Sequence, residues 1–252
     1  MARKRKTSGD QPIGVGMTGK QMKRKKPLSA DYLIDIQPLT DNQKVMFDAW
    51  DEGKMVYAYG VAGTGKTFVA LYKALKEVLD DYSPYEKIYI VRSLVATREI
   101  GFLPGDHEDK SSLYQIPYKN MVQGMFQMPD DNSYEMLYDN LKAQETISFW
   151  STSFIRGTTL DNAIVIIDEC QNLNFHELDS IITRVGQDSK IVFCGDAAQT
   201  DLQKISERTG IIDFQRILQE MDEFQLIEFG IEDIVRSGLV KSYLINKINL
   251  GL

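Results

Sequence analysis

Six short apolar runs are spaced along this chain and separated by longer stretches of mixed polarity. Several of the runs are nearly continuous and rich in β-branched residues, which is typical of parallel strands buried on both faces. The sequence therefore predicts six strands of a mostly parallel sheet, at Met55–Tyr59, Lys87–Val91, Ile147–Ser151, Ala163–Ile167, Lys190–Cys194 and Phe224–Phe229.

Between these runs, apolar residues recur every three or four positions, which indicates helices. A helix also precedes the first strand, with Thr40 as its N-cap and Gln43 as the capping-box partner. The stretch from Leu28 to Pro38 reads as an extended lead-in. Strands that alternate with helices predict a layered α/β domain whose ligands bind at the carboxyl ends of the strands. The remaining helices are expected at Thr67–Leu79, Leu113–Gln127, Tyr134–Gln144, Phe175–Val185, Ile211–Glu223 and Ile231–Ile248.

A glycine-rich loop joins the first strand to the next helix. Its sequence matches the phosphate-binding pattern G-x-x-x-x-G-K-[ST], in the strand–loop–helix context that the pattern requires. Glycines let successive N–H groups curl around a phosphate, and the helix N-terminus adds its positive dipole end. Lys66 would reach the β- and γ-phosphates, and the Thr67 hydroxyl would bind Mg²⁺. We expect the nucleotide to be bound by Gly60, Val61, Ala62, Gly63, Thr64, Gly65, Lys66, Thr67 and Phe68.

Two other strands also end in polar residues suited to phosphate chemistry. The run Ala163–Ile167 is followed by Asp168, a candidate Mg²⁺ carboxylate, and by Glu169, which could orient and deprotonate the attacking water. Past the strand that ends at Cys194, Gln199 could sense the γ-phosphate through its amide. Gln43 could read the edge of an adenine base.

Charge separates the chain into two parts. The first 26 residues hold nine lysines and arginines against one acid, whereas the whole chain has a net charge of −7. We expect residues 1–27 to form a basic, disordered tail that either contacts nucleic acid or only aids solubility, and residues 28–252 to form one domain. No apolar run is long enough for a membrane helix, and no secretory signal is evident. Cys170 and Cys194 are expected to be buried thiols of a soluble, cytoplasmic protein.

Several motifs taken together resemble the PhoH family of P-loop ATPases, which are related to the core of superfamily-one helicases. The likeness spans about residues 38–245, and its more specific parts are the stretches GFLPGD and RGTTL. The matching segments are Gly60–Thr67, Ile88–Ser93, Gly101–Asp106, Phe154–Leu160, Ile164–Asn172, Ile182–Leu202 and Glu232–Val240.

This resemblance implies a RecA-like fold, ATP hydrolysis with Mg²⁺, a link to RNA or single-stranded DNA, and assembly into rings such as hexamers. It assigns adenine contact to Gln43, the metal-linked and catalytic acids to Asp168 and Glu169, the γ-phosphate sensor to Gln199, and phosphate binding to Gly60, Gly63, Gly65, Lys66 and Thr67. Together with the loop chemistry above, the expected catalytic residues include Lys66, Glu169 and Gln199, and the expected metal ligands are Thr67 and Asp168. Arg92 and Ser93 resemble the element that faces a nucleic-acid strand. From Ser93 to Glu99 the chain departs from the family pattern, beginning with serine where proline is usual, so the loop that would make this contact is altered.

A monomeric helicase of this type uses two RecA-like domains with ATP between them, whereas this chain has room for one. An arginine that stabilises the γ-phosphate must therefore come from a neighbouring copy or fold back from the same chain. The candidates are Arg184, Arg236 and Arg156. A homo-oligomer with ATP at the subunit interfaces would supply the arginine from a neighbouring copy.

Two other functions remain open. The protein could be an ATP-gated nucleic-acid-binding or regulatory switch that does not unwind duplexes, with aromatic and basic residues of 101–126 stacking on a strand. A small-molecule kinase is a weaker alternative, because the set Asp168, Glu169 and Gln199 suits attack by water better. An assay of duplex unwinding separates the switch from the helicase.

Overall fold

The computed structural model describes residues 30–92, 107–155, 157–196 and 205–250. The predicted basic tail, the segment from Ser93 to Asp106, Arg156 and Gln199 lie outside these ranges. Their assigned roles therefore stay predictions.

Parallel strands form the centre of the fold, at the positions that the apolar runs predict. Their order across the sheet is β3-β2-β4-β5-β1-β6, and each neighbouring pair is parallel. Parallel neighbours need crossover connections, and helices supply them. The prediction of an α/β fold with a parallel sheet is confirmed. The strands are β1 (Met55–Gly60), β2 (Lys87–Arg92), β3 (Ile147–Ser151), β4 (Ala163–Asp168), β5 (Lys190–Cys194) and β6 (Phe224–Phe229).

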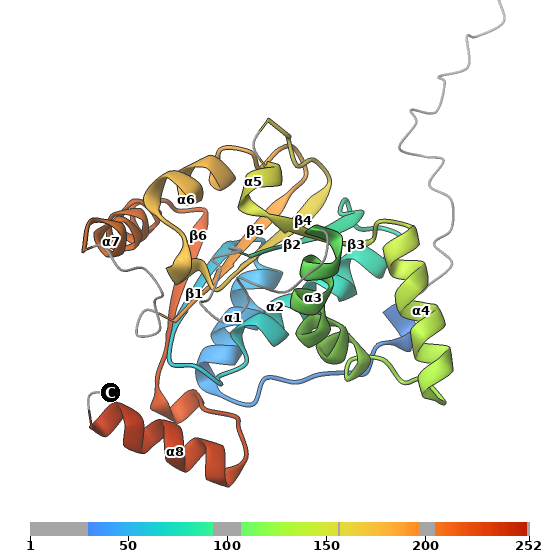
Figure 1. Ribbon diagram of the computed structural model, residues 1–252, viewed down its shortest axis with the longest axis horizontal. Helices are drawn as coiled ribbons and strands as arrows, with labels where there is room; N and C mark the ends of the chain where they lie inside the picture. Colours follow the sequence, from blue (N-terminus) through green and yellow to red (C-terminus); the bar gives the residue numbers. More distant parts are fainter. Residues whose placement is uncertain (1–29, 93–106, 156, 197–204, 251–252) are drawn as a thin grey trace, which may run out of the picture.

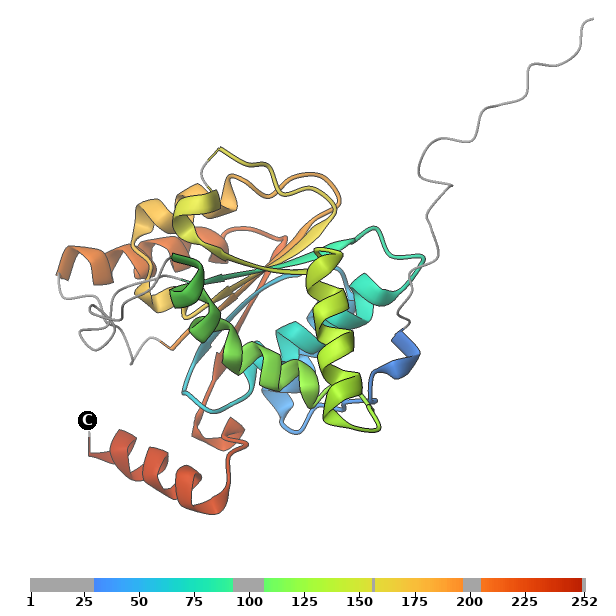
Figure 2. The same cartoon turned by 45° about the vertical axis from the view of Figure 1, so that its right-hand side comes forward.

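Helices cover both faces of the sheet and give a three-layer, RecA-like arrangement (Figure 1). The view in Figure 2 separates the two outer layers. One face packs against α1 (Asp41–Asp51), α2 (Lys66–Leu79), α3 (His107–Gln123) and α4 (Asp131–Ala143). The other packs against α5 (Thr152–Ile155), α6 (Phe175–Ile182) and α7 (Ile205–Gln219).

Strand β4 shows why the apolar runs are continuous. All six of its residues are buried. Ile164 and Ile166 belong to the core on the α2 side, while Val165 and Ile167 belong to the core on the α6 side. Because successive side chains point to opposite faces, a strand covered on both sides is apolar along its interior, and here the one charged residue, Asp168, stands at the carboxyl end.

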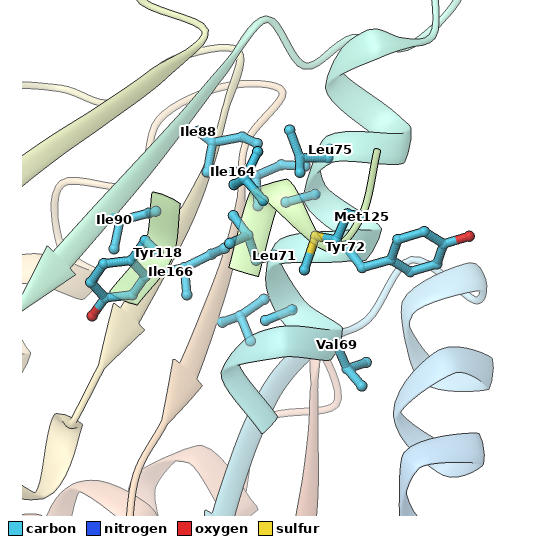
Figure 3. Packing of buried hydrophobic residues seen from close by; sticks show 14 of the residues in the cluster. Val69, Leu71, Tyr72, Leu75, Ile88, Ile90, Tyr118, Met125, Ile164 and Ile166 are labelled. Atoms are coloured by element: carbon cyan, nitrogen blue, oxygen red, sulfur yellow. The ribbon is translucent and has the colours of Figure 1, made fainter. Parts of the chain in front are cut away.

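Helix α2 is anchored along most of its length, which fixes the loop that precedes it. Figure 3 shows Leu71 and Leu75 of α2 packed among Ile88, Ile164 and Ile166 of the central strands. Each of these side chains is at most 1% exposed. A helix held in this way keeps its N-terminus, and with it the glycine loop, in one position relative to the strand ends.

The predicted helix over Ile231–Ile248 is wrong as a single element. The structure has a short 3-10 helix, η4 (Ile231–Asp233), then an extended segment, and then α8 (Gly238–Asn249). The break follows from the Asp233 carboxylate, which accepts hydrogen bonds from the Asn42 side chain at 2.7 Å and from the Gly230 N–H at 2.8 Å. These bonds tie the chain to α1 and stop the helix.

Other element boundaries also differ from those expected. Helix α3 begins at His107, before Leu113, and ends at Gln123 rather than Gln127, with Pro117 inside it. The expected extended lead-in contains a 3-10 turn, η2 (Ala30–Tyr32). Two further short elements, α5 and η3 (Cys170–Asn172), had no counterpart among the predictions. Helices α4, α6 and α7 are shifted by three to six residues at one or both ends.

Helix α8 lies apart from the layered body (Figure 1). None of its residues is buried, and Leu239 and Tyr243 are 83% and 65% exposed. The extended segment before it is fixed to the glycine loop, because the Val235 N–H donates to the Gly63 carbonyl at 3.1 Å.

Both cysteines are buried free thiols, as predicted. Among the described helices, none combines the length and the apolar composition needed to cross a bilayer.

Candidate nucleotide-binding site

The loop after β1 depends on glycine for its path. Gly60 has a φ of +111°, and a Cβ at this position would lie 2.2 Å from the carbonyl oxygen of Phe229. Gly65 has a φ of +84° and is the N-cap of α2. These conformations suit glycine alone, and they allow the chain to turn from strand into helix with its N–H groups facing the inside of the loop.

Lys66 folds back into this loop. Its Nζ donates to the carbonyl oxygens of Gly60 at 3.1 Å and Val61 at 2.7 Å, and to Thr64 Oγ1 at 3.2 Å. Burial lowers the pKa of Lys66, against the opposing influence of neighbouring acidic groups. The ammonium therefore sits where phosphate oxygens are expected, and such oxygens would be stronger acceptors than the neutral carbonyls.

The predicted metal residues lie in direct contact. Thr67 Oγ1 donates to Asp168 Oδ1 at 2.6 Å, although the two residues are 101 positions apart. The other carboxylate oxygen, Asp168 Oδ2, accepts from the hydroxyl of Tyr118 at 2.5 Å. Asp168 is 8% exposed at the end of β4. Both oxygens of this buried carboxylate are therefore held by hydroxyl groups.

Glu169 is held in an unusual conformation beside this pair. Its φ and ψ of 53° and 42° place it in the left-handed region, which is costly for a residue with a Cβ and occurs most often at functional sites. Its Oε2 accepts from Gln171 Nε2 at 2.6 Å, and its Oε1 lies 4.0 Å from the Arg92 guanidinium. The turn aims the carboxylate away from the core, where the hydrogen bond from Gln171 orients it and Arg92 places a positive charge nearby.

Gln171 links Glu169 to the neighbouring strand. It is 2% exposed, and its Oε1 accepts the Asp196 N–H at 2.9 Å. Asp196 follows β5, so one buried amide connects the ends of β4 and β5. The apolar run that ends in two acids predicts a functional segment after β4, but nothing in the sequence distinguishes Gln171 from its neighbours.

A pocket of about 330 Å³ joins these groups at the carboxyl ends of the strands, where the sheet topology predicts a ligand site. It brings together residues 62–68 of the predicted loop, the two acids and Arg236, whereas Gly60 and Val61 do not line it. It is lined by Ala62, Gly63, Thr64, Gly65, Lys66, Thr67, Phe68, Arg92, Pro117, Tyr118, Met121, Asp168, Glu169, Cys194, Gly195, Asp196 and Arg236.

Gln43 lies behind the loop rather than in the pocket lining. It is 4% exposed, its Nε2 donates to the Thr64 carbonyl at 2.8 Å, and its Oε1 accepts the Leu39 N–H at 2.9 Å. Its own N–H donates to Thr40 Oγ1, so the predicted N-cap is confirmed. In a capping box the Gln43 side chain would also accept the N–H of Thr40, but here it accepts the N–H of Leu39. In this arrangement the Gln43 amide holds the loop against α1.

Of the described candidate arginines, the structure places one at the pocket and one away from it. Arg236 is exposed and lies against Gly63, where a Cβ on the glycine would come within 2.9 Å of the arginine Cγ. The Arg184 carbonyl accepts the N–H of Leu160, which precedes β4. Arg184 therefore lies near the amino ends of the strands, the edge opposite to the pocket of its own chain.

The aromatic residues expected to stack on a nucleic-acid strand mostly pack in the protein core, where the structure describes them. Tyr118 and Phe126 are 2% and 6% exposed and belong to the core, so they offer no open ring face to a base. Tyr114 is half-buried. Sequence reasoning missed the role of Tyr118 at Asp168, because an aromatic residue on a helix usually signals packing.

Together, the parallel sheet, the glycine loop before α2 and the acids at the end of β4 define a P-loop nucleotide-binding protein. A family model described as PhoH-like protein matches residues 35–246, so the chain belongs to the PhoH family.

Relatives with this description occur in distant bacteria. The PhoH-like protein of Mycobacterium leprae is 33% identical over 84% of this chain and 60% of its own length. The PhoH-like protein of Bacillus subtilis is 32% identical over 81% and 61%. The chain thus spans about three fifths of these curated relatives.

Among solved structures, similarity is limited to the fold. The large terminase of a thermophilic bacteriophage has a TM-score of 0.48 and 14% identity, over 82% of this chain and 50% of the terminase. The Hef helicase domain of Pyrococcus furiosus has a TM-score of 0.43 and 9% identity, over 76% of this chain and 39% of the helicase chain.

Proposed function

We propose that this protein binds ATP with Mg²⁺ and hydrolyses it. The observation that carries the proposal is the contact of Thr67 with Asp168 at the mouth of the glycine loop, with Glu169 as the next residue. A P-loop hydroxyl, a strand-end carboxylate and a second carboxylate beside it are the groups that attack by water on a γ-phosphate requires.

Binding of the phosphates falls to the glycine loop and α2. The N–H groups from Gly63 to Thr67 and the positive end of the α2 dipole favour negative charge. Lys66 would exchange its carbonyl partners for phosphate oxygens. The anchoring of α2 in the core means that these donors need little reorganisation when the nucleotide binds.

The residues present fit a magnesium ion. A hydroxyl and a carboxylate supply the hard oxygen ligands that Mg²⁺ prefers, in a site where phosphates complete the coordination. Among the residues described, no cluster of three or more His, Cys, Asp or Glu side chains offers a cage made by protein alone. Thr67 and Asp168 would hold the ion, which when bound neutralises charge on the β- and γ-phosphates.

Glu169 is the proposed general base. Its carboxylate would accept the proton of the attacking water, while Gln171 and Arg92 hold its orientation. Both acids line the pocket, but the left-handed backbone at Glu169 leaves its side chain partly exposed there, whereas Asp168 is buried against Thr67.

We further propose that turnover is linked to single-stranded RNA or DNA. The motif resemblance supports this link. Arg92, at the end of β2, belongs to the segment that resembles the family's nucleic-acid-facing element, and it lines the pocket. The test is steady-state ATP turnover with and without each kind of strand. We expect at least one strand to raise turnover, with an effect that weakens as salt increases. Turnover that is the same with every strand would contradict the link.

Arg236 is the proposed arginine for the γ-phosphate within the same chain. Since a charge-assisted hydrogen bond contributes about 1.5–3 kcal/mol, we expect Arg236→Ala to lower kcat about 10- to 100-fold. Arg216→Ala, which removes an exposed arginine on α7, is the matched control. Wild-type turnover by Arg236→Ala would exclude this role.

We propose a homo-oligomer, such as a hexameric ring, in which ATP lies at the subunit interfaces and Arg184 of one copy reaches the nucleotide of its neighbour. Arg184 would have to act on a neighbouring copy. Mixing Arg184→Ala with Lys66→Ala would then restore turnover, because one variant keeps the site and the other keeps the arginine. A mixture as inactive as its components would argue against a shared site.

A nucleic-acid-binding switch remains the second candidate. The described residues form one sheet with one P-loop, whereas helicases of the resembling type place ATP between two such units. ATP-dependent binding of a strand without separation of a labelled duplex would favour the switch.

A further inference from the structure

The hydroxyl of Tyr118 lies at the carboxylate that would hold the metal. It donates to Asp168 Oδ2 at 2.5 Å, while Thr67 holds Oδ1 at 2.6 Å. Tyr118 comes from α3, in the connection between β2 and β3. It belongs neither to the glycine loop nor to the strand that ends in the two acids.

The ring of Tyr118 is fixed by packing. Its side chain is 2% exposed, and its ring lies 5.4 Å from that of Phe149 on β3. Figure 3 shows the ring beside the core residue Ile90, with the hydroxyl pointing away from the other labelled side chains. Burial and the nearby Asp168 raise the pKa of Tyr118, so the hydroxyl keeps its proton and acts as a donor.

Two hydroxyl groups on the two oxygens prevent the carboxylate from rotating. Asp168 can then present the same oxygen toward Thr67 whether or not a metal is bound. Partners of this kind, which orient a metal ligand without touching the metal, typically change metal affinity or activity about 10- to 100-fold.

We propose that Tyr118 is a positioning residue that orients Asp168 for magnesium. The proposal rests on the proposed Mg²⁺-dependent binding of ATP. It assigns a role in the nucleotide site to α3, a helix outside the nucleotide-binding motifs.

The chain offers a matched pair of variants. Tyr118→Phe removes only the hydroxyl and keeps the packed ring. Tyr138→Phe makes the same change on α4, where the Tyr138 hydroxyl is buried and has no hydrogen-bond partner among the described residues. Any loss due simply to removing a buried tyrosine hydroxyl would appear in both variants.

The experiment measures binding of a fluorescent ATP analogue as Mg²⁺ is titrated, and separately in EDTA. For Tyr118→Phe we expect about a tenfold increase in the Mg²⁺ concentration at half-saturation. Binding in EDTA should be unchanged, and kcat should return toward the wild-type value at saturating Mg²⁺. Tyr138→Phe should match the wild type, and melting temperatures show that both variants are folded.

Each outcome has a definite meaning. If the wild type depends on Mg²⁺ and Tyr118→Phe follows the same titration curve, the positioning role is wrong and the proposed function stands. Weaker binding in EDTA as well would show that Tyr118 only supports the fold of the pocket, and this would also overturn the role. If the wild type shows no Mg²⁺-dependent binding, the proposed function fails, and the role of Tyr118 fails with it.

Discussion

Replacing Lys66 with alanine is expected to lower ATP turnover about 100- to 1,000-fold, the effect typical of removing one preorganised donor to a developing charge. Lys66 is the lysine that lines the pocket, and its ammonium already lies inside the glycine loop. The measurement is steady-state phosphate release with saturating Mg²⁺ across a range of ATP concentrations.

Lys76→Ala is the control for this variant. Lys76 is an exposed lysine of the same helix and does not line this pocket, so its loss should leave turnover unchanged. If Lys66→Ala keeps near-normal turnover at saturating ATP, the glycine loop is not the site of hydrolysis. Equal losses in both variants would indicate damage to α2 instead.

Glu169→Gln is expected to separate binding from chemistry. The substitution keeps the shape of the side chain and an oxygen that can accept from Gln171, but it removes the base. Because a positioned base contributes about 10²- to 10⁴-fold, kcat should fall by this amount. The affinity for ATP should stay close to that of the wild type, which makes the variant a trap for the ATP-bound state.

The two quantities need separate measurements. Single-turnover hydrolysis gives the rate, and equilibrium binding of a fluorescent ATP analogue gives the affinity. Glu220→Gln, at an exposed position after α7, controls for the loss of one negative charge. Loss of binding together with turnover would mean that Glu169 maintains the pocket, and the assignment of the base would then move to another residue.

The strands and the glycine loop could be predicted because their signals are local. A strand such as β4, buried on both faces, is apolar up to the acid at its carboxyl end, and the positive φ values at Gly60 and Gly65 require glycine. Each pattern records a constraint that acts within a few residues, so the sequence alone contains it.

Contacts between distant segments could not be predicted in the same way. The Tyr118 hydroxyl meets Asp168 because α3 packs on the face of the sheet beside the end of β4. A tyrosine at a helical position looks the same in the sequence when it only packs. Asp233 breaks the last predicted helix through a bond to Asn42, a residue 191 positions earlier. The amide of Gln43 suits adenine and backbone partners equally well, so its chemistry alone does not predict the bonds to Thr64 and Leu39.

The order of the strands also determines when the nucleotide site can form during synthesis. Strand β1 does not pair with β2, the next strand along the chain; its partners are β5 and β6, with Tyr57 opposite Phe193 and Gly60 opposite Phe229. Contacts between such distant segments form late, because a long stretch of chain must first be ordered. When the glycine loop has just emerged from the ribosome, β5 and β6, the two neighbours of β1, have not yet been synthesised. The loop that comes early in the sequence is among the last parts of the molecule to be completed.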